Sequence, residues 1–418
     1  MRSQRTRGPA GIFGRRHWIP PGAFAFGQLA HGASWLVAII AALTLLTGSD
    51  GWQLAWIHLV VLGWFTTIAF GILLHALPAF TDGVWKAETL ARWSILGFAA
   101  GVFGMVVAFA AASPWLLYAG ILCALFAGVY ILSALITLAK PMLLHSVEGA
   151  VARALAITLG LLLATVILGV LLVLMRVGVP MPWWIVRVPF IHATLGTVGW
   201  LCLLVFGVSL RTLRPITGAA PGTPWMHIAT GTLTLLAIVG LAVGAAEASV
   251  ALLWLGAGCF GAGALLYVAD VVDRLRRATV RHRLPQGFVI ASILWLIVAL
   301  GLGGAALAGD VPPSAYLFVL LIGWVGQMVN AHGHHIGVRL IATIYRGEDD
   351  QTPPERLLSP LAGWMSFVLF QVAIAVVAIG LLCANAGLTA FGSAIGFLGW
   401  CAMSANMLHA KGRALQSA

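Results

Sequence analysis

The sequence predicts an all-α polytopic membrane protein with twelve transmembrane helices, and three observations lead to this fold class. Hydrophobic residues make up 61% of the 418 residues and charged residues only 8%, whereas soluble proteins carry about 25% charged residues. Twelve apolar stretches reach the roughly 20 residues that a helix needs to cross the hydrocarbon core of a bilayer. Lys and Arg are concentrated in both termini and in every second loop between them, which places both termini on one side of the membrane and requires an even number of spans.

The predicted helices form one membrane domain over residues 1–418, in which residues 1–22 are a basic cytoplasmic tail. The first helix is full length and no small-residue cleavage site follows it, so we do not expect a signal peptide. The five cysteines lie singly in apolar runs and read as small core residues. The predicted spans are 23–46, 54–78, 93–111, 115–139, 152–175, 189–213, 225–245, 248–272, 287–308, 315–341, 361–384 and 388–410.

The distribution of charge predicts that both termini face the cytoplasm. Lys and Arg are enriched in the cytoplasmic loops of membrane proteins. The N-terminal tail carries five arginines and the 274–283 loop carries five more, whereas only Arg176 and Arg187 fall on the other side. The net charge of +11 therefore belongs mostly to one membrane face, and we do not read it as nucleic-acid binding.

Three predicted helices, the second, sixth and tenth, share a Gly-Trp motif. They read GWFTTIAFGILLHALP from Gly63, GWLCLLVFGVSLRTLRP from Gly199 and GWVGQMVNAHGHHIGVR from Gly323. Eleven residues after the tryptophan, each has a basic side chain: His75, Arg211 and His335. A motif that recurs every four helices predicts one four-helix unit used three times. The three pseudo-threefold repeats would cover approximately 23–139, 152–272 and 287–410.

Two histidines open equivalent helices on the predicted outer side, His58 in the second and His192 in the sixth. Neutral imidazole is a common ligand of haem iron, and polar residues inside spans usually face the bundle interior. This pattern indicates axial ligation of a haem. The alternative interpretation is that both are interfacial histidines, hydrogen-bonded to the backbone or to lipid headgroups.

A second group of histidines falls at the predicted inner ends of the helices: His75, His227, His332, His334 and His335. A second haem or metal site is one interpretation. The other is a polar collar whose side chains snorkel or bind anionic headgroups. On a regular helix His334 points to a different side from His332 and His335, so the three would not serve one ligand set without a distortion of the helix.

Several function classes lack their residues in this sequence. None of the acidic residues falls near the middle of a predicted span, whereas proton-coupled carriers generally keep a carboxylate there. No nucleotide-binding Walker motif, serine-nucleophile G-x-S-x-G elbow or zinc-binding H-E-x-x-H pair is present. These absences favour a cofactor protein over an ATPase, a hydrolase or a proton-driven pump.

The stretches HLVVLGWFTTIAFGILLHALPAF (58–80) and IHATLGTVGWLCLLVFGVSLRTLRP (191–215) resemble the second and sixth helices of divergent relatives of subunit I of the haem-copper oxidases. The resemblance implies that His58 ligates a low-spin haem and that His192 stands where the family has a copper ligand. It also aligns His332 and His334 with the family's H-x-H, which holds both haems. The copper site needs two adjacent histidines at the seventh helix, where only His227 is found.

The resemblance implies a membrane haem-binding protein with one or two b-type haems, acting in respiratory electron transfer or in the handling of nitric oxide or oxygen, as relatives linked to nitric-oxide tolerance do. One alternative is an active terminal oxidase or nitric oxide reductase subunit, an oxidoreductase with copper. Another is a cofactor-free transporter or metal permease. The expected partners are the lipid bilayer, an electron-donor cytochrome or small subunits, and the expected location is the bacterial inner membrane.

Overall fold

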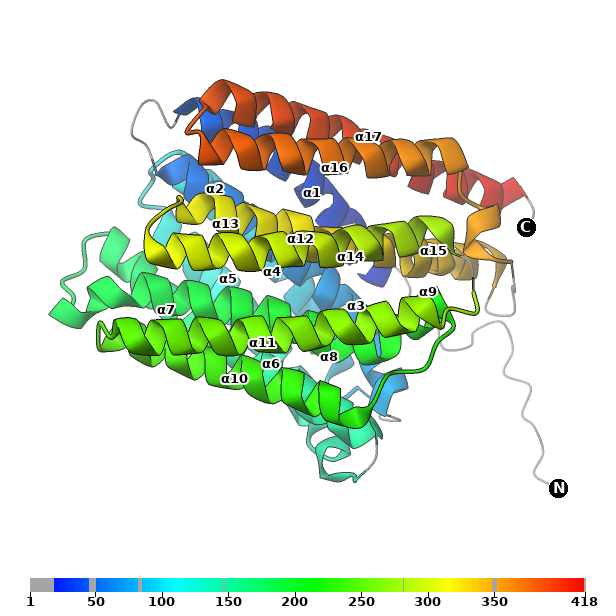
Figure 1. Ribbon diagram of the computed structural model, residues 1–418, viewed down its shortest axis with the longest axis horizontal. Coiled ribbons are helices and arrows are strands. Elements are labelled where there is room, and N and C mark those ends of the chain that lie inside the picture. The colour runs from blue at the N-terminus through cyan, green and yellow to red at the C-terminus, as the bar shows by residue number, and fades with distance from the viewer. Residues whose placement is uncertain are drawn as a thin grey trace.

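The computed structural model describes residues 19–44, 50–81, 85–145, 147–280, 282–347 and 352–416. All regular elements in these ranges are helical, and twelve of the helices are long and apolar enough to cross a membrane. The predicted class of an all-α multi-pass membrane protein and the predicted number of spans are therefore confirmed. Figure 1 shows the helices running roughly parallel in one bundle.

Nine spans are single helices and three are interrupted by wider π-helical turns. The single helices are α1 (Ile19–Thr44), α4 (Glu88–Ala110), α5 (Leu116–Leu138), α6 (Val147–Arg176), α10 (Pro224–Ala246), α11 (Val250–Arg276), α12 (Arg283–Ala308), α16 (Pro360–Leu382) and α17 (Ala386–Gln416). The second span is α2 (Gly51–His58), η2 (Leu59–Thr66) and α3 (Thr67–Thr81). The sixth is α7 (Val188–Thr194), η5 (Leu195–Cys202) and α8 (Leu203–Thr212). The tenth is α13 (Pro313–Phe318), η6 (Val319–Gly326), α14 (Gln327–His332), η7 (Gly333–Gly337) and α15 (Val338–Arg346).

The tenth span is longer than the sequence predicted. It continues to Arg346, whereas the predicted limit was residue 341. His332, His334 and His335 therefore lie about three to four turns before the end of the helix, farther from its end than the sequence predicted. The apolar pattern stops near residue 341, but the helix continues because α15 packs against α17.

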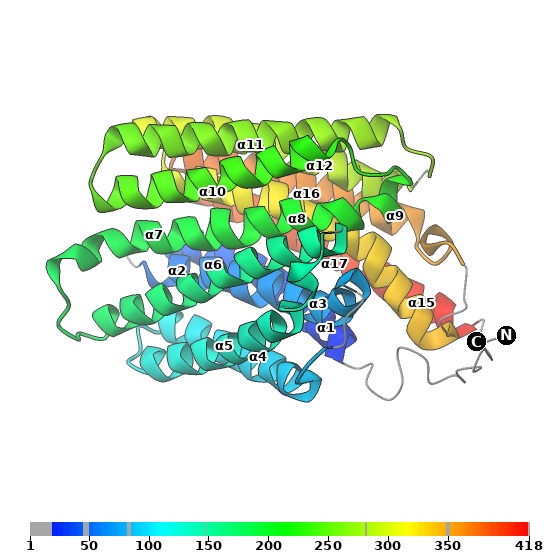
Figure 2. The ribbon, with the colours of Figure 1, turned by 90° about the horizontal axis from the view of Figure 1, so that it is seen from below.

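Three helical hairpins form separate parts of the periphery: α4–α5, α10–α11 and α16–α17. The α16–α17 hairpin lies at one edge in Figure 1, and the other two lie at opposite edges in Figure 2. Each turn contains one left-handed alanine, 136 residues apart along the chain: Ala112, Ala248 and Ala384. The amide after each alanine closes the end of the preceding helix on a carbonyl five residues back, from Ser113 to Ala108, from Ser249 to Gly244 and from Asn385 to Gly380.

The three interrupted spans also share a local structure. Their eight-residue π-segments η2, η5 and η6 each begin five residues before a tryptophan, namely Trp64, Trp200 and Trp324. All three indoles are fully buried. Trp200 donates a hydrogen bond from Nε1 to Thr66 Oγ1 at 2.9 Å, which ties the sixth span to the second. π-Segments inside α-helices frequently occur at functional sites.

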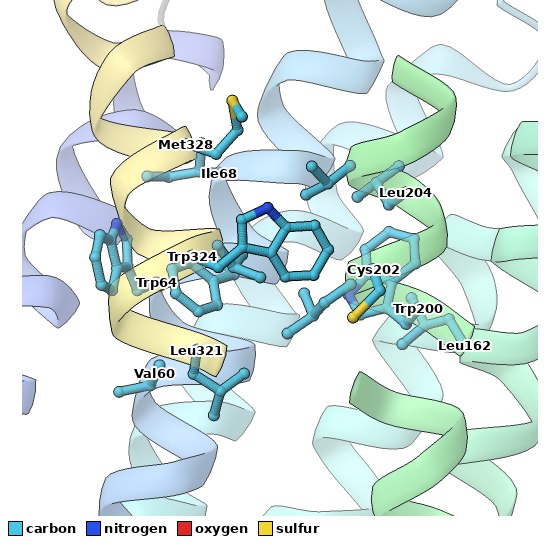
Figure 3. Close-up of a cluster of buried hydrophobic side chains, with 14 of the residues drawn as sticks. Val60, Trp64, Ile68, Leu162, Trp200, Cys202, Leu204, Leu321, Trp324 and Met328 are labelled. Carbon is cyan, nitrogen blue, oxygen red and sulfur yellow. The ribbon is translucent and has the colours of Figure 1, made fainter. Parts of the chain in front are cut away.

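The three tryptophans lie at one level of the bundle, and we call them the tryptophan layer. In Figure 3, Val60 and Leu321 lie on one side of the layer, and Ile68, Met328 and Leu204 lie on the other. The layer thus divides the middle of the protein into two regions. One lies toward the Asp50 end, where α2 begins, and the other toward the Arg346 end, where α15 stops.

Candidate functional site

On the Asp50 side of the tryptophan layer, the structure brings His58 and His192 together. His58 ends α2 and His192 lies in α7, so the two side chains come from different spans. Their ring centroids are 6.4 Å apart and their ring planes are inclined by 28°. We call these residues the histidine pair.

Both rings of the histidine pair are held through Nδ1. His58 Nδ1 lies 2.8 Å from the carbonyl oxygen of Leu54, one turn earlier in α2. His192 Nδ1 lies 3.0 Å from the carbonyl oxygen of Thr165 in α6. A carbonyl can only accept, so Nδ1 carries the proton and a neutral ring keeps its lone pair on Nε2. This is the arrangement in which proteins hold imidazoles as metal ligands.

The spacing of the histidine pair fits one shared metal. Two trans imidazoles with metal–nitrogen distances of 2.0–2.1 Å have ring centroids roughly 6 Å apart. Gly169 of α6 supports this placement, because a Cβ atom there would lie 3.2 Å from His192 Cε1. On the other side, the Phe109 ring packs 4.9 Å from the His58 ring.

A cation lies beside the histidine pair. The Arg176 guanidinium is 5.9 Å from the centre of the Phe109 ring and forms two hydrogen bonds to the Asp50 carboxylate, at 2.8 and 3.0 Å. These bonds hold the pKa of Asp50 below its ordinary value. In the sequence, Arg176 stood out only as an exception to the charge distribution, and neither Phe109 nor Asp50 was predicted to lie near the histidines. A basic residue on the side that is otherwise poor in basic residues was the one sequence feature that pointed to this position.

On the other side of the tryptophan layer lies a cavity of about 620 Å³, which we call the axial chamber. The second, sixth and tenth spans line it, and Ile68, Leu204 and Met328 border it next to the layer. At the Arg346 end, the segment from Thr352 to Pro354 contributes to its lining. Most of its walls are therefore aliphatic.

Two of the predicted ligands, His332 and His335, line the axial chamber together with Arg339. His332 Nδ1 lies 2.7 Å from the Met328 carbonyl oxygen, which leaves the Nε2 lone pair free. Within the described part of the chain, neither His332 Nε2 nor His335 Nδ1 has a hydrogen-bond partner, although both are buried. Buried polar atoms are normally satisfied by a partner, so each of these two nitrogens can still take a hydrogen-bond partner at the wall of the chamber.

His334 lies on a different side of the tenth span and is fully buried. Its ring packs 5.1 Å from the Phe288 ring of α12, and its Nδ1 is 2.9 Å from the Asn330 carbonyl oxygen. Even with the π-turn η7 in this segment, His334 does not line the axial chamber. The structure thus separates His332 and His335 from the middle histidine of the motif.

His227 is not part of either region. His227 Nε2 lies 3.7 Å from Asp270 Oδ1 in α11, and Asp270 forms a buried ion pair with Arg274 at 2.7 Å. The side chain of His75 lies outside the described residues. Where side chains are described, no three His, Cys, Asp or Glu residues gather around a point that could hold a metal. The histidine pair and His227 therefore do not form one three-ligand group.

Comparison with known proteins found no matching family model and no matching curated protein. The fold and the interior side chains define the chain as a helical multi-pass membrane protein with buried histidines.

Proposed function

We propose that the protein is a membrane haem protein of the haem-copper oxidase subunit I type, and that His58 and His192 bind a b-type haem. One observation carries this proposal: two imidazoles from different spans lie with centroids 6.4 Å apart, and each is fixed through Nδ1 by a backbone carbonyl. That spacing matches two axial ligands of one iron. When bound, haem would supply reversible one-electron transfer.

The surroundings of the histidine pair support a porphyrin ligand. Phe109 offers an aromatic face beside His58, and Gly169 allows the His192 ring to pack closely against α6. Arg176 has N–H donors besides the two that bond to Asp50, and one of them would donate to a carboxylate of the porphyrin. If His58 and His192 both held the haem, no iron position would be left for a gas, so this site would favour respiratory electron transfer over direct handling of nitric oxide or oxygen.

The proposal includes three four-helix repeats with both termini in the cytoplasm. The three π-segments placed alike around Gly-Trp motifs support the repeat, as do the three hairpin alanines at intervals of 136 residues. The orientation is supported by the arginines at the Arg346 end, since cytoplasmic loops are rich in basic residues. In this orientation the histidine pair faces the outer side of a bacterial inner membrane, where a cytochrome or small subunit would donate electrons.

The absorption spectrum of the purified protein tests the proposal. We expect a reduced b-type band in the wild-type protein and at least a tenfold loss of bound haem in His58→Ala and in His192→Ala, because either change removes an axial ligand. His409→Ala is the matched control, since this histidine is exposed on α17 and should leave the band unchanged. Full haem content in both ligand variants would refute the assignment.

A cofactor-free transporter or permease is the second candidate, and the axial chamber favours it. The chamber offers about 620 Å³ of space on the axis between three spans, as a substrate path would. A colourless wild-type protein, purified from haem-replete cells, would favour this candidate over the haem protein.

A further inference from the structure

The axial chamber is long and narrow. Its lining extends from Leu201 to Thr212 along the sixth span and from Val325 to Thr343 along the tenth, which corresponds to roughly 16 and 27 Å at 1.5 Å per residue. The volume of about 620 Å³ over these lengths gives a mean cross-section of roughly 20–40 Å². A round channel of that section is at least roughly 5–7 Å across, which is wide enough for a hydrocarbon chain whose atoms contact the wall at about 3.5–4 Å.

The volume also limits the size of the occupant. At about 30 Å³ per water-sized group, the chamber takes about twenty such groups, as many as one long acyl chain with a small head. The aliphatic walls near the tryptophan layer suit the end of the chain, because burial of apolar surface stabilises the bound state.

The head of the occupant is specified by the polar end of the chamber. Arg339 lines this end and donates from Nη1 to the Thr352 carbonyl oxygen at 3.4 Å, so further N–H donors of its guanidinium remain. His332 Nε2 and His335 Nδ1 are buried there without hydrogen-bond partners among the described groups. The Arg339 cation complements an acidic head, because arginine binds carboxylate and phosphate oxygens in the same way. His335 in its Nδ1–H form donates to the same oxygens, whereas His332 Nε2 carries a lone pair and can only accept.

We propose that the axial chamber binds a single-chain anionic amphiphile, with its acidic head on Arg339 and His335 and its chain directed toward the tryptophan layer. The segment from Thr352 to Pro354 lines the chamber at the same end. This site goes beyond the proposed haem function and does not depend on it, because the chamber is lined by residues that follow the three tryptophans in their spans, whereas His58 and His192 precede theirs.

Binding of radiolabelled palmitate to the full-length protein in dodecyl maltoside tests the proposal. We expect saturable binding of about one palmitate per chain, weakened at least tenfold in Arg339→Gln and abolished in Val208→Phe, which fills the chamber. The matched controls are Arg153→Gln, an arginine that bonds to loop carbonyls elsewhere, and Ile157→Phe on the exposed face of α6. Both controls should bind palmitate like the wild-type protein.

Competition binding to the wild-type protein tests the proposal even if a variant fails to fold. Hexadecanol has the same chain without the acid, and we expect it to compete with palmitate at least tenfold more weakly than unlabelled palmitate does. Mass spectrometry of the extracted native ligand then separates a free fatty acid from a lysophospholipid, the two sources of this chemistry.

Three results would overturn the proposal. The first is palmitate binding that is non-saturable in the wild-type protein or unaffected by both chamber variants. The second is equal competition by hexadecanol. The third is a haem content that falls in His332→Ala, which would make the chamber a porphyrin site. Haem content in Arg339→Gln and Val208→Phe should equal that of the wild-type protein, so failure here is distinguishable from failure of the haem proposal.

Discussion

The histidine pair and the axial chamber are built from the same residue type but differ in what surrounds the imidazoles. In the pair, two rings from different spans face each other across 6.4 Å and pack against Phe109 and Gly169. In the chamber, His332 and His335 lie on one helix and border a long apolar space. Two imidazoles from different spans at this distance suit a metal shared between them, whereas imidazoles on one helix beside a cavity suit a ligand that fills that cavity.

A histidine whose Nδ1–H is held by a backbone carbonyl is not identified as a metal ligand by that hydrogen bond alone. His58, His332 and His334 all hold Nδ1 against a carbonyl four residues earlier in their own helix. A neutral histidine inside a helix satisfies one nitrogen most easily in this way, and the other is left for any partner. The opposed second ring is what distinguishes the pair.

The largest effect is expected at the tryptophan layer that separates the two regions. Trp324→Ala should lower the free energy of unfolding by about 3–5 kcal/mol, because it removes a large, fully buried side chain and leaves a cavity. Denaturant unfolding in detergent measures this loss. Trp115→Ala is the control, since this side chain is 70% exposed and surface changes usually stay within about 0.5 kcal/mol. Equal effects in both variants would mean that the layer does not hold the regions apart.

The second largest effect is expected on haem affinity, from a substitution beside the histidine pair that leaves both ligands in place. Gly169→Val should displace the His192 ring, since even a Cβ atom there lies 3.2 Å from Cε1. Haem affinity should fall by about 10–100-fold, as when the support of a metal ligand is lost, and haem retention during dilution measures it. Gly160→Val on the same helix has open space around it and should retain haem. Normal retention in the first variant would place the iron away from His192.

The smallest effect concerns the ion pair beside the histidine pair. The pKa of Asp50 is lowered in the folded protein, mainly by its hydrogen bonds from Arg176, so the pair stabilises the fold above the unfolded carboxyl pKa of about 3.9. That stabilisation is lost as the pH falls through the lower, folded pKa. The Asp50 side chain is 66% exposed, so Asp50→Asn should cost no more than about 0.2–1 kcal/mol.

Unfolding of the wild-type protein and of Asp50→Asn at pH 7 and at pH 2–3 would measure this contribution. The difference between the two proteins should shrink on acidification. A difference that grows at low pH would contradict the role of the carboxylate.

The number of spans and the helical class were predictable because the bilayer imposes a minimum length and a low charge on each span. The tight juxtaposition of His58 and His192 was not, because the sequence places both near one end of their helices and leaves their rotation open. The sequence also missed the extension of the tenth span to Arg346, since α15 is held by packing against α17 rather than by apolar composition. The axial chamber has no sequence signal, because cavities arise from side chains on three separate spans.

The proposed role of the histidine pair requires that both rings bind the same iron. Pulsed electron paramagnetic resonance on oxidised protein labelled with ¹⁵N-histidine tests this directly. The account predicts couplings from two coordinated imidazole nitrogens. Both couplings should disappear when either His58 or His192 is replaced, because either replacement causes loss of the bound haem. Couplings from a single imidazole, or two that persist in both variants, would contradict it.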